Sequence, residues 1–241
     1  MSSFRNISKY IAIKSGLFSK VRSLEIYLNA FTLKVHDDDY RSIPSKINGG
    51  AIADIGANLG QSVISFRRLF PDSKIYAFEP NPACIKTLRR VSYVLKGNVE
   101  VKNFGIGNVS STLKFYVPTL NGGIELLQEG SFDKSSFSSL ITKQRINQRF
   151  DLKESDIQVT KLDSLNLSLS LLKIDVQGLE KQVLEGALQT ITRDRPLIFL
   201  ERDQKYEAEI DRFLADLGYV ALKLKTNSLY VYQGITPVIE L

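Results

Sequence analysis

The sequence has very few of the residues that build disulfides and metal sites. Cys84 is the single cysteine and His36 the single histidine among 241 residues, and tryptophan is absent. One thiol cannot form a disulfide within the chain, which excludes a disulfide-stapled secreted scaffold and predicts a reducing, cytoplasmic location. It also cannot supply the paired cysteines of a CxxC zinc site, and one imidazole argues against a histidine-rich metal site.

Long apolar runs are also missing. No run approaches the roughly 18 residues that a membrane-spanning helix needs. Residues 1–20 do not fit a secretory signal either, because four basic residues interrupt every hydrophobic stretch and no small-residue cleavage pattern follows. The sequence therefore predicts neither a transmembrane segment nor an export signal.

The charge balance is modestly basic, with 32 Lys and Arg against 26 Asp and Glu, a net charge of +6. The apolar fraction of 43% and the charged fraction of 24% are ordinary globular values, which excludes disorder, collagen and coiled coil. A surplus of this size permits an anionic substrate, a nucleic acid or a membrane surface as partner, but requires none.

Along most of the chain, apolar strand-like runs alternate with amphipathic helical runs. This alternation predicts a parallel sheet covered on both faces, with an antiparallel strand at one edge. Asn81 is expected to cap a helix that starts at Pro82. The expected strands are 51–55, 74–78, 99–104, 171–175, 197–201, 220–224 and 229–232, and the expected helices are 62–70, 82–96, 180–192 and 206–217.

The middle of the chain departs from this alternation. Apolar residues alternate with polar ones at Leu113, Phe115 and Val117, which indicates an inserted strand. Residues 118–157 are rich in Ser, Gly, Lys and Gln, which is typical either of a lid or binding loop or of a surface insertion that merely packs. We therefore expect an N-terminal helical or cap segment, 1–49, and a domain, 50–241, that contains the inserted loop region 118–157.

The first strand is followed by a loop with the spacing D-x-G-x-N-x-G, from Asp54 to Gly60. A dinucleotide fingerprint needs G-x-G-x-x-G, but Asn58 and Gln61 occupy its second and third glycine positions, which disfavours a pyrophosphate cradle. Gly56 and Gly60 still let the backbone approach a ligand closely. An acid at the strand end suits a ligand with cationic or hydroxyl groups and no phosphate. S-adenosylmethionine fits this description, because it has an ammonium, a sulfonium and a ribose diol.

Three further acids end strands at the edge where open α/β sheets bind ligands. Glu79 lies 19 residues after Gly60, where a carboxylate accepts hydrogen bonds from ribose hydroxyls. The alternative is that the glycines only form turns and that Glu79 is exposed. Asp175 is a candidate to take a proton from a hydroxyl, to orient it or to help hold a divalent ion, or else it caps the next helix. Glu201 ends a strand at the same edge. Glu180 is ambiguous, because an acid in the first turn of a helix is favoured electrostatically whatever the function.

These motifs resemble those of the FkbM family of S-adenosylmethionine-dependent methyltransferases. The resemblance rests on DIGANLG at 54–60, FEPNP at 78–82 and LKIDVQGLE at 172–180, and extends from about Gly50 to Glu201. It implies a class I methyltransferase fold, an α/β, Rossmann-like three-layer sandwich with a seven-stranded, mostly parallel sheet and an antiparallel last strand. It also implies methyl transfer, usually to a hydroxyl oxygen and often on sugars or polyketide-type products. Further similar segments are 103–108, 135–140, 160–165 and 183–187.

The resemblance also assigns roles to individual residues. Family members often have Glu where this chain has Gln177, which removes one carboxylate, so a divalent metal is permitted but not supported. Residues 1–49 match no part of the family that we can assign. By position, Asp54, Gly56, Asn58 and Gly60 would surround the methionine part of S-adenosylmethionine, Glu79 would hold its ribose, Asn103 to Ile106 would lie near its adenine, and Asp175 would be beside the transferred methyl.

Methyl transfer from a sulfonium requires an acceptor oxygen aligned behind the methyl carbon, and a base helps a hydroxyl to attack. Asp175 is our candidate base. His36 lies in the run His36-Asp37-Asp38-Asp39, which suits either a cation or, as we favour, a solvated acidic turn. The expected acceptor is a small-molecule or glycan hydroxyl, and the sequence predicts neither its identity nor an oligomeric state.

Three other functions are weighed against this one. An RNA-directed methyltransferase agrees with the basic balance, but Asp175-Val-Gln-Gly replaces the Asn/Asp-Pro-Pro-aromatic motif of amino-directed enzymes, and basic residues are scattered. A nucleotide-dependent oxidoreductase is disfavoured by the missing glycines. A non-catalytic binding protein with the same fold stays open. The basic stretch 4–20 has apolar residues at helical spacing, so it contacts either an anionic membrane or, as we favour, its own domain.

Overall fold

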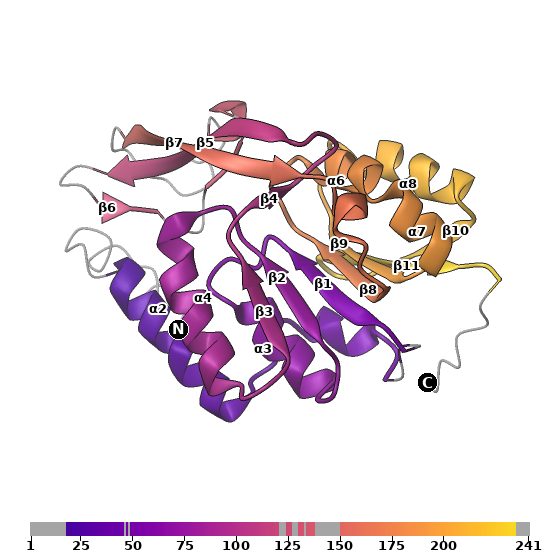
Figure 1. Ribbon diagram of the computed structural model, residues 1–241, viewed down its shortest axis with the longest axis horizontal. Helices are drawn as coiled ribbons and strands as arrows, with labels where there is room; N and C mark the ends of the chain where they lie inside the picture. Colours follow the sequence, from indigo (N-terminus) through magenta and orange to yellow (C-terminus); the bar gives the residue numbers. More distant parts are fainter. Residues whose placement is uncertain are drawn as a thin grey trace.

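Seven strands form the central sheet in the computed structural model of the protein (Figure 1). The structure describes residues 18–45, 47, 49–120, 124–126, 130–132, 134–137 and 150–234. The strand order is β3 (Val99–Lys102), β2 (Ile75–Phe78), β1 (Ala51–Ile55), β8 (Leu169–Ile174), β9 (Leu197–Glu201), β11 (Asn227–Tyr232) and β10 (Tyr219–Lys223). All neighbours are parallel except β11, which is antiparallel to both β9 and β10. The predicted mostly parallel sheet with an antiparallel last strand is confirmed.

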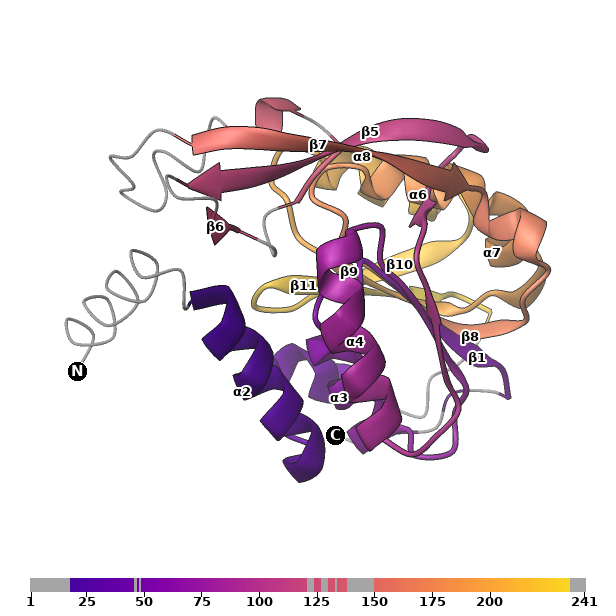
Figure 2. The ribbon, with the colours of Figure 1, turned by 60° about the vertical axis from the view of Figure 1, so that its left-hand side comes forward.

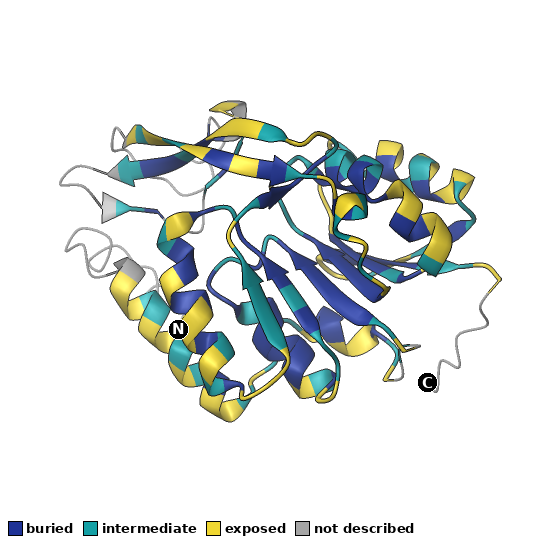
Figure 3. Ribbon diagram, in the orientation of Figure 1, coloured by how far each residue is buried: buried dark blue, intermediate teal, exposed yellow. Residues whose placement is uncertain are grey.

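The middle strands of this sheet are buried on both faces, as Figure 3 shows. Every residue of β1 and β8 is buried, which explains their nearly continuous apolar sequences. Successive side chains point to opposite faces, so Ile52 and Leu171 join one hydrophobic core, while Ala53 and Leu172 join the other. The sheet therefore separates two cores, each closed by its own layer of helices.

Helices cover the two faces of the sheet in the arrangement seen in Figures 1 and 2. One layer contains α2 (Phe18–Thr32), α3 (Gln61–Leu69) and α4 (Pro82–Val94), and the other contains α6 (Glu180–Gly186), α7 (Leu188–Asp194) and α8 (Glu207–Asp216). As predicted, Asn81 caps α4, because its side chain accepts a hydrogen bond from the backbone N–H of Ala83 at 3.0 Å. Within the described residues, no helix combines the length and the apolar character that a membrane crossing requires.

The single helix predicted over 180–192 is wrong, because two short helices occupy this stretch. Helix α6 ends at Gly186, and the φ of −112° at Ala187 lies outside the helical range. At this point the backbone packs directly on another loop, since a Cβ at Gly186 would lie 1.9 Å from the carbonyl oxygen of Gly107. The close approach holds α6 and α7 against the loop that follows β4 (Gly105–Ile106).

A second sheet lies above the carboxyl-terminal ends of the central strands (Figures 1 and 2). Its order is β4, β7 (Phe150–Thr160), β5 (Ser111–Leu120) and β6 (Ile124–Glu125). The inserted strand predicted around Leu113 to Val117 is thus present as β5. The irregular region predicted over 118–157 is wrong at its two ends, because β5 and β7 pair antiparallel over their whole length. Residues 138–149 of that region, including part of the similar segment 135–140, lie outside the described residues.

Residues 18–45 pack into the same hydrophobic core as the central sheet. Ile26 and Ala30 of α2 and Tyr40 of a 3₁₀ helix, η1 (Asp38–Ser42), are buried in it. The helix expected over 4–20 is described only from residue 18, where α2 begins. This N-terminal segment therefore forms part of the first helical layer.

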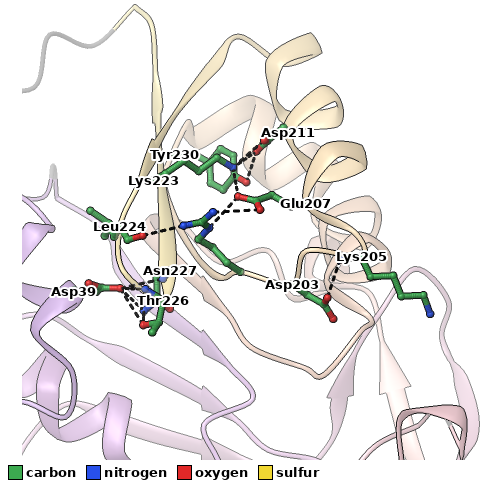
Figure 4. Close-up of polar contacts among 11 residues, drawn as sticks. Asp39, Asp203, Lys205, Glu207, Asp211, Lys223, Leu224, Thr226, Asn227 and Tyr230 are labelled. Atoms are coloured by element: carbon green, nitrogen blue, oxygen red, sulfur yellow. Dashed lines mark hydrogen bonds and ion pairs between the residues drawn. The ribbon is translucent and has the colours of Figure 1, made fainter. Parts of the chain in front are cut away.

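One buried carboxylate joins η1 to the turn between β10 and β11 (Figure 4). Asp39 accepts hydrogen bonds from the backbone N–H groups of Thr226, at 2.7 Å, and Asn227, at 3.0 Å, and from both of their side chains. Burial opposes the charge, but these hydrogen bonds lower the pKa of Asp39 to about 2. The solvated acidic turn predicted at 36–39 is therefore wrong for Asp39, which links η1 to the turn between β10 and β11.

Candidate active site

A cavity of about 190 Å³ lies between the carboxyl-terminal edge of the central sheet and the second sheet. Loops after β1, β2, β8 and β9 form its floor, and β5 contributes Phe115 from above. Phe115 contacts Phe132 edge to face, with ring centroids 4.9 Å apart. The apolar walls are Ile55, Phe78, Phe104, Ile106, Phe115 and Phe132, and the carboxylates are Glu79, Asp175 and Glu201.

Glu79 is the buried carboxylate directly after β2. Its Oε2 accepts a hydrogen bond from the backbone N–H of Asn58 at 2.8 Å, and its Oε1 accepts one from Asn81 at 2.7 Å. Burial raises the pKa of Glu79 to about 7, against the lowering effect of these two hydrogen bonds. Each carboxylate oxygen has a second lone pair, so Glu79 can accept two further hydrogen bonds from a group in the cavity. The alternative of an exposed Glu79 is wrong, because the side chain is buried.

The loop after β1 has the conformation that its sequence demands. Gly56 has a φ of +80°, and a Cβ there would lie 1.9 Å from the carbonyl oxygen of Asp175. Only glycine permits this approach of the two strand ends. Asn58 also adopts a left-handed φ, of 51°, which Asn tolerates better than most residues. Both residues line the cavity.

Asp54 lies beneath this loop and does not line the cavity. It is fully buried, and its Oδ1 lies 3.0 Å from the Nζ of Lys173 on the neighbouring strand β8. Its Oδ2 accepts a hydrogen bond from the Ser62 hydroxyl at 2.5 Å. Lys173 also donates to the carbonyl oxygen of Gly56 at 2.9 Å. The ion pair between Asp54 and Lys173 thus supports the loop after β1 from beneath.

Asp175 and Glu201 form a second acidic group with Gln177 between them. The Nε2 of Gln177 lies 3.3 Å from Oδ1 of Asp175 and 3.3 Å from Oε2 of Glu201. Burial opposes ionisation of Asp175, but the nearby Lys173, at 3.5 Å, lowers the pKa of Asp175 overall. Burial and the Asp175 charge raise the pKa of Glu201 to about 8. At neutral pH this pair carries one negative charge and one proton.

The helix-cap alternative for Asp175 is not what the structure contains. Helix α6 begins after Leu179, four residues further along the chain. Glu180 accepts a hydrogen bond from the backbone N–H of Gly178 at 3.1 Å, so its role is local. Gln177 has a left-handed φ of 57°, which is uncommon outside glycine and typical of functional sites.

A second cavity, of about 130 Å³, adjoins the first and is almost entirely polar. The two cavities share Gly56, Asn58, Asp175 and Glu201 as a common wall. His36 lines the second cavity at its exposed edge, and burial lowers the pKa of His36, so its imidazole is neutral at pH 7. The other polar side chains there are Asp37, Tyr40, Gln61, Ser62, Lys173, Thr226 and Asn227.

The remaining predicted site residues have different positions. Ile106 lines the first cavity. Asn103 lies outside it and donates hydrogen bonds to the carbonyl oxygens of Glu79, at 2.9 Å, and Pro80, at 3.2 Å. Gly60 is the N-cap of helix α3, and a Cβ there would lie 3.0 Å from a methyl carbon of Val91 on α4. Asn103 and Gly60 therefore contact the loops and helices around the cavity and do not line it.

Sequence reasoning missed several residues of the site. Lys173 lies inside the LKID motif. A lysine within the apolar run 171–174 was the available signal, because a charge on a buried strand needs a partner. The aromatic pair of the second sheet had no signal, because its position depends on how that sheet folds over the edge. Among the described residues, no group of three or more His, Cys, Asp or Glu side chains is arranged to hold a metal ion.

The strand order, the loop after β1 and the carboxylate after β2 define a class I methyltransferase fold. Residues 54–221 match the model of the methyltransferase FkbM domain, and the chain belongs to this family of methyltransferases. The predicted FkbM resemblance is thus confirmed, and the oxidoreductase alternative is excluded.

Individual relatives agree with the family assignment. "Methyltransferase sdnD" of Sordaria araneosa is 29% identical over 190 residues, which cover 70% of each chain. "Methyltransferase 1" of Beauveria bassiana (strain ARSEF 2860) is 30% identical over 144 residues, covering 56% of this chain and 57% of the relative. The crystal structure of methyltransferase FkbM from Methylobacillus flagellatus KT has a TM-score of 0.53 at 14% identity, and it shares the fold. That match covers 88% of this chain and 59% of the other, so this chain spans only part of that protein.

Proposed function

We propose that this methyltransferase transfers the methyl group of S-adenosylmethionine to a hydroxyl oxygen on a small molecule or glycan. The observation that carries the proposal is the shared wall of the two cavities, where Asp175 and Glu201 both contact Gln177. A hydroxyl acceptor must lose its proton during transfer, and the carboxylate of Glu201 in its deprotonated form can receive it.

The larger cavity fits the adenosine half of the methyl donor. Its walls are aromatic and aliphatic, as a planar base requires, and Glu79 has lone pairs free for a ribose diol. Ile106 and Phe104 would contact the base, and Glu79 would accept from the ribose hydroxyls. We therefore assign the predicted ribose-binding role to Glu79.

The smaller cavity fits the amino-acid half. It presents neutral hydrogen-bonding groups together with the acidic side chains of Asp37, Asp175 and Glu201 and the ammonium of Lys173. Both cavities meet at Gly56 and Asn58. The junction is then where the sulfonium would lie, beside Asp175, as the family resemblance implies. Asp54 would act indirectly in this arrangement, because Lys173 and Ser62 occupy its oxygens.

The chain's own groups supply positioning and proton acceptance. S-adenosylmethionine, when bound, supplies a methyl group on a positively charged sulfur. Methyl transfer forms a bond from the acceptor oxygen to the methyl carbon and breaks the carbon–sulfur bond, and the hydroxyl proton goes to Glu201, which must be deprotonated to receive it. Asp175 stays charged beside Lys173, so it orients the hydroxyl, and Glu201 is the stronger base of the two. Gln177 holds both carboxylates in register.

Incubation of the chain with methyl-labelled S-adenosylmethionine and a panel of sugars, glycans and small alcohols tests the reaction. We expect a labelled ether product that forms with wild type and not with Asp175→Ala. Label that appears instead on RNA or on nitrogen would contradict O-methylation. Donor binding without any product on the alcohol panel would favour the non-catalytic alternative.

Binding of donor fragments tests the two halves separately by calorimetry. Glu79→Gln should weaken both S-adenosylhomocysteine and 5′-methylthioadenosine by about tenfold or more, because both contain the ribose. His36→Ala should weaken only S-adenosylhomocysteine, since 5′-methylthioadenosine lacks the amino-acid tail. Asp38→Ala is the matched control, because Asp38 is exposed and lines neither cavity. Equal losses for both ligands in His36→Ala would refute the assignment of the smaller cavity.

A further inference from the structure

The two helical layers carry opposite charge. Helices α2, α3 and α4 contain seven basic residues and one acidic residue, Glu25, whereas α6, α7 and α8 contain seven acidic and three basic residues. The net charge of +6 for the whole chain hides this separation. A surface that is basic on one side and acidic on the other presents different faces to an anionic partner.

The basic layer also exposes apolar side chains. On α2, Val21, Leu24, Leu28 and Phe31 are 49%, 56%, 53% and 62% exposed, and their spacing places them on one face of the helix. The opposite face of α2 packs Ile26 and Ala30 into the core. Helix α4 lies beside α2 (Figures 1 and 2) and exposes Tyr93 by 85%. These five residues are half of the large hydrophobic side chains that are exposed in the described part of the chain.

Exposed cations accompany this apolar stripe. Lys86, Arg89 and Arg90 of α4 share the outer face of the helix with Tyr93 and are exposed, as is Lys20 of α2. None of these four forms an ion pair with another residue that the structure describes. Their charges are therefore available to a partner. We call the outer faces of α2 and α4, with these apolar and basic residues, the α2–α4 face.

We propose that the α2–α4 face binds the surface of a membrane that contains anionic lipids. Aliphatic and aromatic side chains beside lysine and arginine are the composition of interfacial helices, which place the apolar residues at the acyl boundary and the cations among the headgroups. Each cation near such a surface adds to the attraction, which falls with salt. The stretch that precedes α2 has the same sign, since no acidic residue occurs before Glu25.

Other occupants fit this face less well. Two copies of the face would bring like charges together, because its four cations have no ion-pair partner among the described residues. A nucleic acid would pair with the cations and could stack on Phe31 and Tyr93, but it would leave the aliphatic side chains of Val21, Leu24 and Leu28 without a partner. A lipid surface uses both the charges and the aliphatic side chains.

Co-sedimentation of the full chain with vesicles tests the proposal. We expect binding to vesicles of phosphatidylcholine mixed with phosphatidylserine, none to phosphatidylcholine alone, and a loss of binding as salt rises. Leu24→Ser with Leu28→Ser removes the centre of the stripe, and Arg89→Glu with Arg90→Glu reverses two cations. Each double variant should bind anionic vesicles at least about tenfold more weakly.

Matched controls come from the acidic layer and its neighbouring edge. Leu188→Ser with Leu222→Ser changes two side chains that are 40% and 47% exposed, and Arg212→Glu reverses an exposed cation of α8. These variants should bind vesicles as wild type does. Circular dichroism and S-adenosylhomocysteine affinity, unchanged in all variants, show that folding is intact. The proposal would be overturned by equal losses in the controls, by binding to neutral vesicles or by no sedimentation with anionic vesicles. Displacement of the vesicles by an RNA oligonucleotide would also overturn it.

Discussion

The ammonium of Lys173 lies 3.0 Å from the carboxylate of Asp54, and both side chains are buried. Burial alone would lower the pKa of Lys173, but the negative charges of Asp54 and Asp175 raise it, so the lysine stays protonated. The pair connects β1 to β8 directly below the cavity. The shape of the first loop thus depends on a buried ion pair that the ligand itself need not touch.

Breaking this pair should destabilise the protein strongly. Lys173→Met leaves the Asp54 charge buried without its partner and should reduce the free energy of unfolding by about 3–5 kcal/mol, measured by urea denaturation. Adding Asp54→Asn should restore part of the loss. The matched control is Lys74→Met, which breaks the exposed ion pair with Glu100 and should leave the free energy of unfolding nearly unchanged. Similar losses in the two lysine variants would show that the buried pair has no special importance.

Donor affinity should depend on the protonation of Glu79. Its pKa is raised to about 7, and ribose hydroxyls donate to the charged form, so binding should tighten as pH rises through about 7. Below that pH, calorimetry with S-adenosylhomocysteine should show affinity falling by up to about tenfold per pH unit. Glu79→Gln removes the titrating group and should flatten the profile as well as lower it. A wild-type affinity that does not change between weakly acidic and alkaline pH would refute the ribose role.

The titration of Glu201 should depend on its neighbour. Because burial and the Asp175 charge hold the pKa of Glu201 at about 8, kcat/KM should rise as pH increases through that value. Asp175→Asn removes the negative neighbour and should lower the pKa of Glu201. Carbon-13 NMR of carboxyl-labelled glutamate measures this shift without an acceptor, and Glu201→Gln identifies the signal. A Glu201 pKa that stays at about 8 in Asp175→Asn would show that the Asp175 charge does not raise it.

The same carboxylate should reduce stability at alkaline pH. A glutamate whose pKa is higher in the folded than in the unfolded protein favours unfolding progressively above the unfolded value and up to about pH 8. Glu201→Gln should therefore raise Tm above pH 8. We expect only about 2–4 °C, roughly 1 kcal/mol for this chain length, because Glu201 is only partly buried and water screens its charge. At acidic pH, where Glu201 is protonated in both states, Tm should be unchanged, and an equal gain at acidic pH would contradict this explanation.

Asp39 should be necessary for stability, whereas its neighbour should not. Asp39→Ala leaves the backbone N–H groups of Thr226 and Asn227 without their acceptor and should cost about 2–4 kcal/mol in urea denaturation. Asp38→Ala removes a charge from the same turn, but that side chain is fully exposed and the expected change is near zero. The pKa of Asp39 is lowered to about 2, so its contribution is complete above the ordinary aspartate pKa and disappears as pH falls through about 2. Equal effects of the two substitutions would contradict this assignment.

Local patterns in the sequence were enough to predict the architecture of the central domain. Apolar runs such as 51–55 and 171–175 specify buried strands, and the Asn81-Pro82 pair specifies the start of α4, because these preferences act within a few residues. The same reasoning placed Glu79, Asp175 and Glu201 at one sheet edge, since parallel strands end together. Local patterns failed at 180–192, where contact with Gly107 interrupts the helix, and at 118–157, where strand pairing replaces an irregular loop.

The sequence by itself determined the family, the sheet and the acids at its edge, because these depend on short motifs and on periodicity. Only the tertiary structure decided which acids face the cavity: Asp54 is neutralised by Lys173 from another strand, whereas Asp175 and Glu201 meet through Gln177. It also decided that His36 lines the site and that Asp39 is buried. The charge and burial of a carboxylate are set by groups that are distant in sequence, so no local pattern could specify them.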